Sequence, residues 1–158
     1  MWQRKQTLYL GIALALAALL HMLDLASYER LGKEGAVTLR LYGLYGADGA
    51  RVDPPLSIPL YLVNALMIVQ LVIAIALFKK RHRQLRFTRL SFLFSLGMIA
   101  GIVFTHNSVA SAMGTANTVK GTLLPGAYIP FILPVLVWLA ERAIKKDEEL
   151  VKSAERLR

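Results

Sequence analysis

IPLYLVNALMIVQLVIAIALFKKRHRQLRFTR, residues 58–89, joins an apolar segment to a strongly basic one, and this order indicates the class of protein. The part up to residue 78 carries no charged side chain, and as a helix it covers about 30 Å, the thickness of the hydrocarbon core of a bilayer. The part from residue 79 onward holds a cluster of cations: Lys79, Lys80, Arg81, Arg83, Arg86 and Arg89. This order is typical of a membrane-spanning helix that ends at a charged interface.

Three further stretches have the same apolar character, at residues 7–26, 90–106 and 123–140, and none of them contains Lys or Arg. Hydrophobic residues make up 56% of the 158 residues, and the mean hydropathy of +0.49 exceeds that of an ordinary soluble domain. Because backbone groups in lipid must be paired within their own segment, each stretch is expected to be a helix. The sequence therefore predicts a single all-α membrane domain, residues 1–158, built as a bundle of four transmembrane helices.

The first stretch has an alternative interpretation as a signal peptide, because the basic MWQRK precedes an apolar run. The run is long, however, and no convincing small-x-small cleavage site precedes Ser27. Three apolar stretches would remain after cleavage, so a membrane protein is expected under either interpretation.

Cations are unevenly shared between the two sides that four spans create. The N-terminus, the loop 79–89 and the tail 141–158 hold fourteen Lys and Arg, whereas the loops 27–57 and 107–122 hold five. The positive-inside rule therefore predicts that both termini are cytoplasmic. The cluster in residues 79–89 is interpreted as a topology signal that contacts anionic lipid headgroups. The net charge of +9 would also suit a nucleic-acid binder, but the apolar stretches argue against that class and no nucleic-acid partner is expected.

Two regions outside the apolar stretches have readable patterns. In the loop 27–57, Val37, Leu39 and Leu41 alternate with polar residues and are followed by Gly-Ala-Asp-Gly, which predicts a small extracytoplasmic β-hairpin. The loop 107–122 is polar and shows no such pattern. The tail 141–158 has apolar and charged residues at helical spacing, which predicts an amphipathic helix that lies on headgroups or docks against a partner.

The start MWQRKQTLYL and the close KKDEELVKSAERLR resemble an uncharacterised family of four-span inner-membrane proteins of Bacteroidota-type bacteria, domain of unknown function 4293. In layout the resemblance covers the whole chain. It implies a location in a bacterial inner membrane with the topology inferred from charge. It implies no catalytic residue, because the family has no established activity.

Counting 1.5 Å per residue along each expected helix brings several polar side chains to one depth. They form a candidate polar layer in the outer leaflet: His21, Asp24, Asn64, His106 and Tyr128. Asp24 follows His21 by three residues, so both are expected on one helical face. The layer is interpreted either as a proton-binding or ligand site or as groups that water satisfies at the interface. No metal or other cofactor is expected.

Other residues are expected to pack helices together. Gly97 and Gly101 form a GxxxG pattern, and Ser91 and Ser95 form a second pair of small residues. Gln70, near the middle of its stretch, is expected to hydrogen-bond across the same interface.

These features favour a non-catalytic accessory or scaffolding subunit that associates with other integral membrane proteins. The alternative is a small transporter or proton-binding or ligand-binding protein that uses the polar layer. An intramembrane enzyme is a weaker hypothesis, because acids and bases are few.

Overall fold

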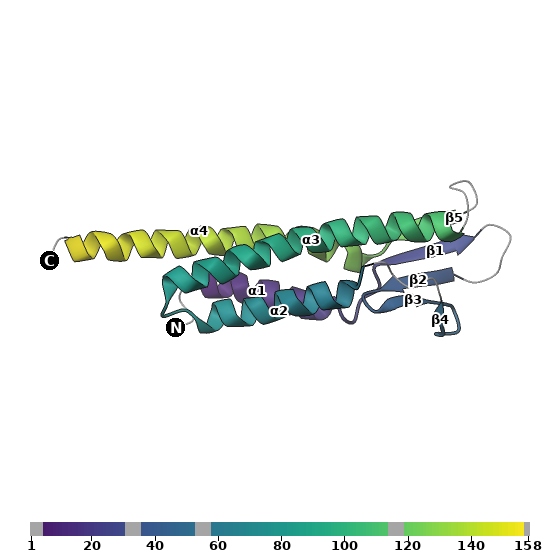
Figure 1. Cartoon of the computed structure of the whole chain (residues 1–158), viewed down its shortest axis with the longest axis horizontal. Coiled ribbons are helices and arrows are strands. Elements are labelled where there is room, and N and C mark those ends of the chain that lie inside the picture. The colour runs from purple at the N-terminus through teal and green to yellow at the C-terminus, as the bar shows by residue number, and fades with distance from the viewer. Residues whose placement is uncertain (1–4, 31–35, 53–57, 114–118, 157–158) are drawn as a thin grey trace.

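The computed structural model describes residues 5–30, 36–52, 58–113 and 119–156. Its elements in chain order are α1 (Lys5–Leu19), β1 (Ala26–Arg30), β2 (Ala36–Arg40), β3 (Gly43–Tyr45), β4 (Arg51–Val52), α2 (Leu60–Ala76), α3 (Arg81–Met113), β5 (Val119–Leu123), the 3₁₀ helix η1 (Pro125–Tyr128) and α4 (Ile129–Arg156). The molecule is elongated, with the four helices along its length and the strands gathered at one end (Figure 1).

The helices pack in a ring in which α1 contacts α2 and α4, and α3 contacts the same two helices. Each helix contributes buried apolar residues at helical spacing. On α1 these are Leu10, Ala13 and Ala17, and on α2 they are Met67, Leu71 and Ala74. Residues three or four apart lie on one side of a helix, so such a stripe can face its neighbours along the whole length.

The strands form one antiparallel sheet in the order β4-β3-β2-β1-β5. In the register, Ala26 of β1 lies opposite Leu39 of β2 on one side and Leu123 of β5 on the other. Tyr28, Leu39 and Leu44 are buried, as expected for strands with one face against a core. The sheet therefore joins the connection after α1 to the connection between α3 and α4.

The turn expected after the alternating residues is present between β3 and β4. Gly49 has a φ of 75°, a conformation that glycine adopts readily. The backbone N–H of Ala50 donates to Asp48 Oδ1 over 3.1 Å, and the N–H of Gly46 donates to the carbonyl of Ala50 over 2.9 Å. The Gly-Ala-Asp-Gly segment is thus a hydrogen-bonded turn within a larger sheet.

The predicted fold class, an all-α bundle of four transmembrane helices, is wrong. The strands form a five-stranded sheet instead of an isolated hairpin, and most of the fifth strand, Val119–Leu123, comes from the loop 107–122, where the sequence showed no pattern. Among the described residues, two helices are long and apolar enough to cross a membrane, 81–112 and 125–151, whereas α1 and α2 have 15 and 17 residues. The first helix is shorter than expected because the chain turns at residues 20–23 and enters β1 at Ala26.

Both long helices extend beyond the apolar stretches that predicted them. α3 begins at Arg81, so most of the basic segment 79–89 is helical, and it continues past residue 106 to contact β1 and β5. α4 continues to Arg156, in agreement with the helix predicted for the tail, and extends past the other helices (Figure 1). Pro134 lies inside α4, while Pro130 lies in its first turn.

Candidate functional site

The distribution of buried and exposed residues on α3 is inverted relative to a soluble protein. Buried residues in its first half include polar side chains: Gln84, Thr88, Ser91 and Ser95. Its exposed positions include large apolar side chains with exposed fractions of 42 to 63%: Leu90, Leu93, Leu96, Val103 and Phe104. In water a helix buries its apolar face, so α3 is arranged for an apolar surrounding on its outer face.

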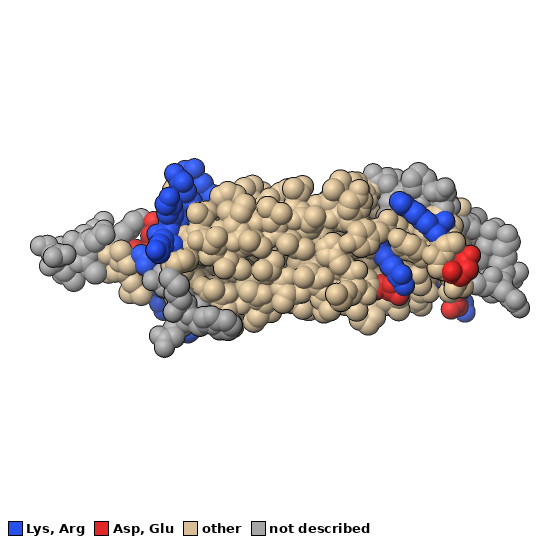
Figure 2. Space-filling model, turned by 90° about the horizontal axis from the view of Figure 1, so that it is seen from below, with Lys and Arg blue, Asp and Glu red and all other residues tan. Residues whose placement is uncertain are grey.

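The other helices add to this apolar surface. Exposed large side chains include Leu8 and Ile12 on α1, Leu66, Val69 and Val72 on α2, and Phe131, Val135 and Trp138 on α4. On the face shown in Figure 2, a region without Lys, Arg, Asp or Glu separates a cluster of cations at one end from mixed charges at the sheet end. Only 33% and 44% of the residues in the apolar windows of the two long helices are buried, so most of these windows form surface.

His21 and Asn64, two members of the predicted polar layer, are in contact where the bundle meets the sheet. The Asn64 amide nitrogen donates to the carbonyl of Ala17 over 2.9 Å and to His21 Nε2 over 3.2 Å. In neutral His21 the proton then lies on Nδ1, which is 2.8 Å from the hydroxyl of Tyr42. Tyr42 in turn stacks on Tyr61, with ring centroids 5.9 Å apart. Both ring nitrogens of His21 therefore have partners on other elements.

Asp24 does not face His21 as expected. α1 ends at Leu19, so the helical spacing that would align Asp24 with His21 does not exist. Asp24 instead pairs with Arg40 of β2, with Arg40 Nε donating to Asp24 Oδ1 over 2.5 Å. This hydrogen bond, together with the charge of Asp24, raises the pKa of the Arg40 guanidinium further above its ordinary value. The pair ties the end of the first connection to the sheet.

His106 belongs to a separate contact. It lies on α3 and shares a 2.8 Å hydrogen bond between its Nδ1 and the hydroxyl of Tyr28 on β1. Tyr28 is fully buried, and this burial raises the pKa of Tyr28 to about 12. A Cβ at Gly121 of β5 would lie 3.1 Å from the His106 ring and 3.3 Å from Tyr28, so the two strands and α3 meet closely here.

Tyr128, the last member of the predicted layer, is 57% exposed and lies at the end of η1. The layer therefore divides into the His21–Asn64 contact, the Asp24–Arg40 pair, the Tyr28–His106 contact and an exposed tyrosine. In the part of the chain that the structure describes, no group of three or more His, Cys, Asp or Glu is arranged to hold a metal ion. Tyr28, Tyr42 and Arg40, which complete these contacts, were not identified from sequence because their partners are distant in the chain.

The two glycines of the GxxxG pattern have different surroundings. A Cβ at Gly101 would lie 2.8 Å from Leu60 Cδ2, so Gly101 allows α2 and α3 to approach closely. At Gly97 no such contact lies within 4 Å among the described residues. Gly97 is exposed beside Leu96 and Ala100 on the outer face of α3.

The other residues expected to pack helices bond within their own helices or lack a partner. The hydroxyls of Ser91 and Ser95 donate to the carbonyls of Phe87 and Phe92 over 2.9 and 2.6 Å. For Gln70, the Oε1 atom is buried without a hydrogen-bond partner in the described part of the chain.

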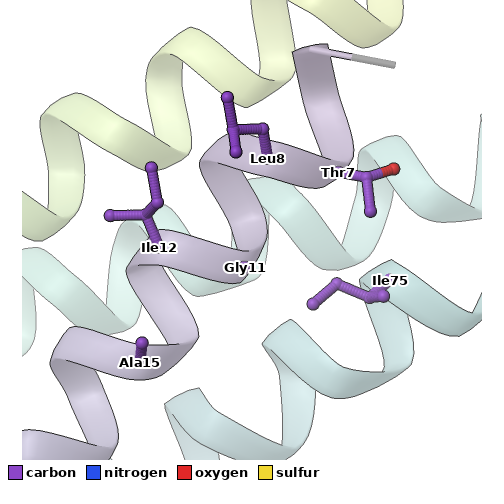
Figure 3. Close-up of a pocket in the computed structure, with 6 residues that line it drawn as sticks. All are labelled: Thr7, Leu8, Gly11, Ile12, Ala15 and Ile75. Carbon is purple, nitrogen blue, oxygen red and sulfur yellow. The ribbon is translucent and has the colours of Figure 1, made fainter. Parts of the chain in front are cut away.

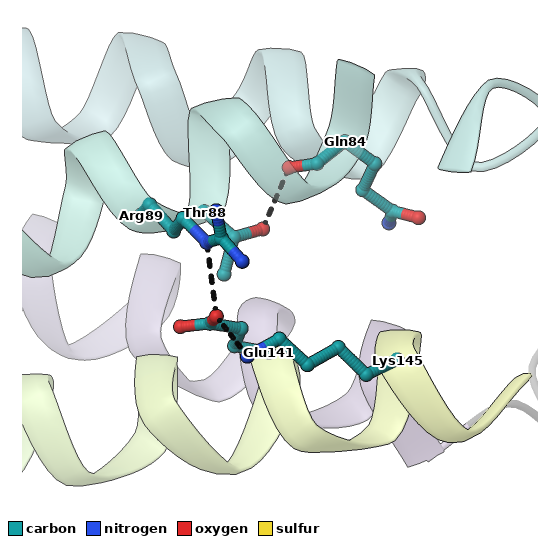
Figure 4. A network of polar contacts seen from close by, with 5 residues as sticks. All are labelled: Gln84, Thr88, Arg89, Glu141 and Lys145. Atoms are coloured by element: carbon teal, nitrogen blue, oxygen red, sulfur yellow. Dashed lines mark hydrogen bonds and ion pairs between the residues drawn. The ribbon is translucent and has the colours of Figure 1, made fainter. Parts of the chain in front are cut away.

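The end of the bundle opposite the sheet combines an ion-pair network with buried amides. Glu141 of α4 accepts from Arg89 Nε over 3.0 Å and from Lys145 Nζ, four residues further along the same helix, over 2.8 Å (Figure 4). Thr88 donates to the backbone carbonyl of Gln84, whose amide extends away from this network. The side chains of Gln84 and Gln6 are fully buried, and within the described residues neither amide has a hydrogen-bond partner.

Comparison with known proteins identifies the family. The family model described as Domain of unknown function (DUF4293) matches residues 2–157. The chain belongs to this family. This confirms the resemblance drawn from the two ends of the sequence. None of the curated proteins compared with the chain matches it.

The family match includes every described helix and strand. The matched range runs along nearly the whole chain, so it contains the helices, the sheet and the basic end. Two helices have the length and composition to cross a membrane. The contacts described above are therefore properties of one continuous family domain.

Proposed function

We propose that this chain is a multi-pass protein of a bacterial inner membrane that acts as a non-catalytic accessory or scaffolding subunit of a larger membrane assembly. The observation that carries the membrane placement is the inverted pattern of α3, with Gln84, Thr88 and Ser91 inside and Leu93 and Phe104 outside. Lipid is the surrounding in which such a helix is stable, because it solvates the outer apolar face and leaves small polar residues to pack inside.

The proposed orientation places the basic end in the cytoplasm. Figure 2 shows Lys and Arg gathered at the end of the bundle opposite the sheet. Arg89 of the basic segment pairs there with Glu141 of α4, and the cations Arg142, Lys145 and Lys146 follow Glu141 on the same helix. An excess of Lys and Arg favours the cytoplasmic side, where they contact anionic headgroups. Both termini then lie in the cytoplasm and the sheet lies outside.

Cysteine labelling tests this orientation cleanly, because the chain contains no cysteine. Ala47→Cys places a thiol in the exposed turn of the sheet, and Ser153→Cys places one on the exposed part of the tail. In spheroplasts, a membrane-impermeant maleimide should label Ala47→Cys alone, and Ser153→Cys should react only after lysis. The opposite pattern, or recovery of the protein in the soluble fraction, would contradict the proposed placement.

A role in association with other proteins is supported by two exposed apolar surfaces, one on α3 and one on the tail of α4. Gly97 leaves an open position among exposed apolar residues of α3, and small residues at such positions let helices approach closely in lipid. The tail of α4 exposes Leu150 and Val151, which are 60% and 37% accessible. Both surfaces are available to other integral membrane proteins.

Extraction in a mild detergent tests association, with a tag on the C-terminus and mass spectrometry of the proteins that co-purify. The unaltered chain should bring down larger membrane proteins in fixed ratio. Gly97→Leu should lose them while the chain stays folded, because the leucine enters open space and removes a helical glycine. Truncation after residue 146 should also weaken association.

Ala18→Leu serves as the control, since it introduces the same leucine side chain at an exposed position of α1. It should keep the partners. Recovery of the unaltered chain alone, or unchanged partners in both Gly97→Leu and the truncated chain, would contradict the scaffold proposal.

The alternative, a small transporter or ligand-binding protein, is favoured by one observation. Asn64 Oδ1, at the His21–Asn64 contact, and Gln70 Oε1, six residues further along α2, are buried without partners among the described residues. Polar groups inside an apolar bundle often mark a pathway. If this alternative holds, His21→Ala should abolish transport by a protein that remains folded and inserted, and Gly97→Leu should leave transport unchanged.

A further inference from the structure

An apolar groove runs between α1 and α2 near the basic end of the bundle. It has a volume of about 500 Å³ and is lined by Thr7, Leu8, Gly11, Ile12 and Ala15 of α1 and by Ile75 of α2. Figure 3 shows Gly11 between the side chains of these two helices, at a position where no side chain fills the space. No described atom of a neighbouring element lies within 4 Å of a Cβ built at Gly11. The groove is thus a consequence of small residues on α1.

The length of the groove matches one leaflet of a bilayer. From Thr7 to Ala15 the helix rises about 12 Å, and half of a hydrocarbon core is about 15 Å thick. Ile75 lies in the last turn of α2, so both walls of the groove end at the same end of the bundle. A partner helix that crosses the membrane would need a groove of about twice this depth. A single acyl chain needs only the depth of its own leaflet.

Three lysine side chains, those of Lys5, Lys79 and Lys80, lie at the basic end of the two helices that form the groove. Lys5 lies on the face of α1 that carries Leu8 and Ile12, because residues three and four apart share a face. Lys79 and Lys80 lie four and five residues after Ile75, in the connection between α2 and α3. In the described part of the chain no carboxylate forms an ion pair with any of these three lysines. The ammonium of Lys79 lies 5.8 Å from the centre of the Phe78 ring, a contact that leaves its hydrogen-bond donors available.

We propose that this groove binds one acyl chain of an anionic phospholipid, whose phosphate lies among Lys5, Lys79 and Lys80. The apolar walls fit the acyl chain, and the three ammonium groups, which form no ion pair among the described residues, complement the charge of the headgroup. The inference rests on the membrane placement proposed above but not on the association with partner proteins. It assigns to this family domain a lipid site in the cytoplasmic leaflet.

The test uses the purified full chain in nanodiscs that contain equal amounts of phosphatidylcholine and phosphatidylglycerol. After transfer to detergent, native mass spectrometry counts and identifies the lipids retained by each protein molecule. The unaltered chain should retain one lipid, with phosphatidylglycerol strongly preferred. The double variant Gly11→Leu, Ala15→Leu should lose it, because the leucines fill the groove without meeting a neighbour at Gly11.

The lysines are tested separately with Lys79→Gln and Lys80→Gln. Each change should lower the preference for phosphatidylglycerol about fivefold while a lipid is still retained, because the cation acts on the headgroup and the groove on the chain. Ala100→Leu is the control, since it adds bulk to an exposed position on α3 outside the groove. It should leave both retention and preference unchanged.

Several outcomes would overturn the lipid site. These are loss of the lipid from the unaltered chain, equal retention by the groove-filling variant, and an unchanged preference after removal of the lysines. A dimer that dissociates in the groove-filling variant would instead assign the groove to a second copy. Failure of the chain to enter nanodiscs would contradict the membrane placement itself, whereas insertion without a retained lipid would contradict only the lipid site.

Discussion

At the sheet end of the bundle, two buried side chains, Asn64 and Tyr28, bond to partners on other elements, although Asn64 Oδ1 and Thr105 Oγ1 have no partner among the described residues. At the basic end, the buried amides bond to no other element in the described part of the chain. Asn64 bonds to Ala17 and His21, and Tyr28 bonds to His106 across 78 positions of sequence. At the opposite end, the amides of Gln6 and Gln84 are buried without partners among the described residues. Hydrogen bonds between elements therefore position the helices against the sheet. At the basic end, apolar packing and the ion pairs of Glu141 hold the helices together.

The largest effect is expected from Tyr28, the largest side chain that is fully buried at the sheet end. Tyr28→Ala should lower the free energy of unfolding by about 3–5 kcal/mol, because it leaves a cavity and removes the bond to His106. Tyr28→Phe keeps the ring and should cost only about 1 kcal/mol. Thermal unfolding in detergent followed by circular dichroism measures both, and equal losses would contradict the packing role assigned to the ring.

Two substitutions test whether buried amides contribute differently to stability at the two ends of the bundle. Asn64→Leu should destabilise the chain by about 1–3 kcal/mol, because the carbonyl of Ala17 and His21 lose a donor. Gln84→Met should raise stability, because it removes a buried amide that has no partner among the described residues and keeps its length. Chemical unfolding in mixed micelles compares the two variants. A clear destabilisation by Gln84→Met would show that its amide is bonded in the folded protein.

The Tyr28–His106 contact also predicts a response to alkaline pH. Burial raises the pKa of Tyr28 to about 12, above its ordinary value of 10.0. A raised pKa means that the neutral phenol is favoured by the fold, so its stabilising contribution is complete below pH 10 and is lost as the pH rises toward 12. Tyr28→Phe should remove this part of the alkaline loss. Unfolding midpoints measured across this range would contradict the assignment if both proteins lose stability in parallel.

The smallest effect is expected from the ion pair between Asp24 and Arg40. Arg40 is half exposed, and exposed pairs contribute little because water screens them and ordering the side chains has an entropic cost. Asp24→Asn and Arg40→Gln should therefore barely change the unfolding midpoint in detergent. The double variant should match the single ones. A large coupling between the two substitutions would mean that this pair organises the sheet more than its exposure indicates.

Part of the candidate site was predictable from local patterns. His21 and Asn64 were expected at one depth and do bond to each other, because both lie near the same end of neighbouring helices. The prediction that Asp24 and His21 share one face of a helix was wrong, because α1 ends at Leu19 and helical spacing no longer applies beyond it. Tyr42 and Tyr28 gain their roles only through strand pairing, which has no local signal in the sequence.

Composition and helical periodicity are local properties, and they were sufficient to predict the apolar stretches, the uneven distribution of cations and the helical tail, while the two ends of the sequence indicated the family. The tertiary structure was needed to show that residues 119–123 add a strand beside residues 26–30, and that α1 ends before the apolar stretch does. It also decided that Gly101 packs inside the bundle while Gly97 faces outward. These outcomes depend on which distant segments meet, and a helix or strand cannot specify its partners by its own spacing.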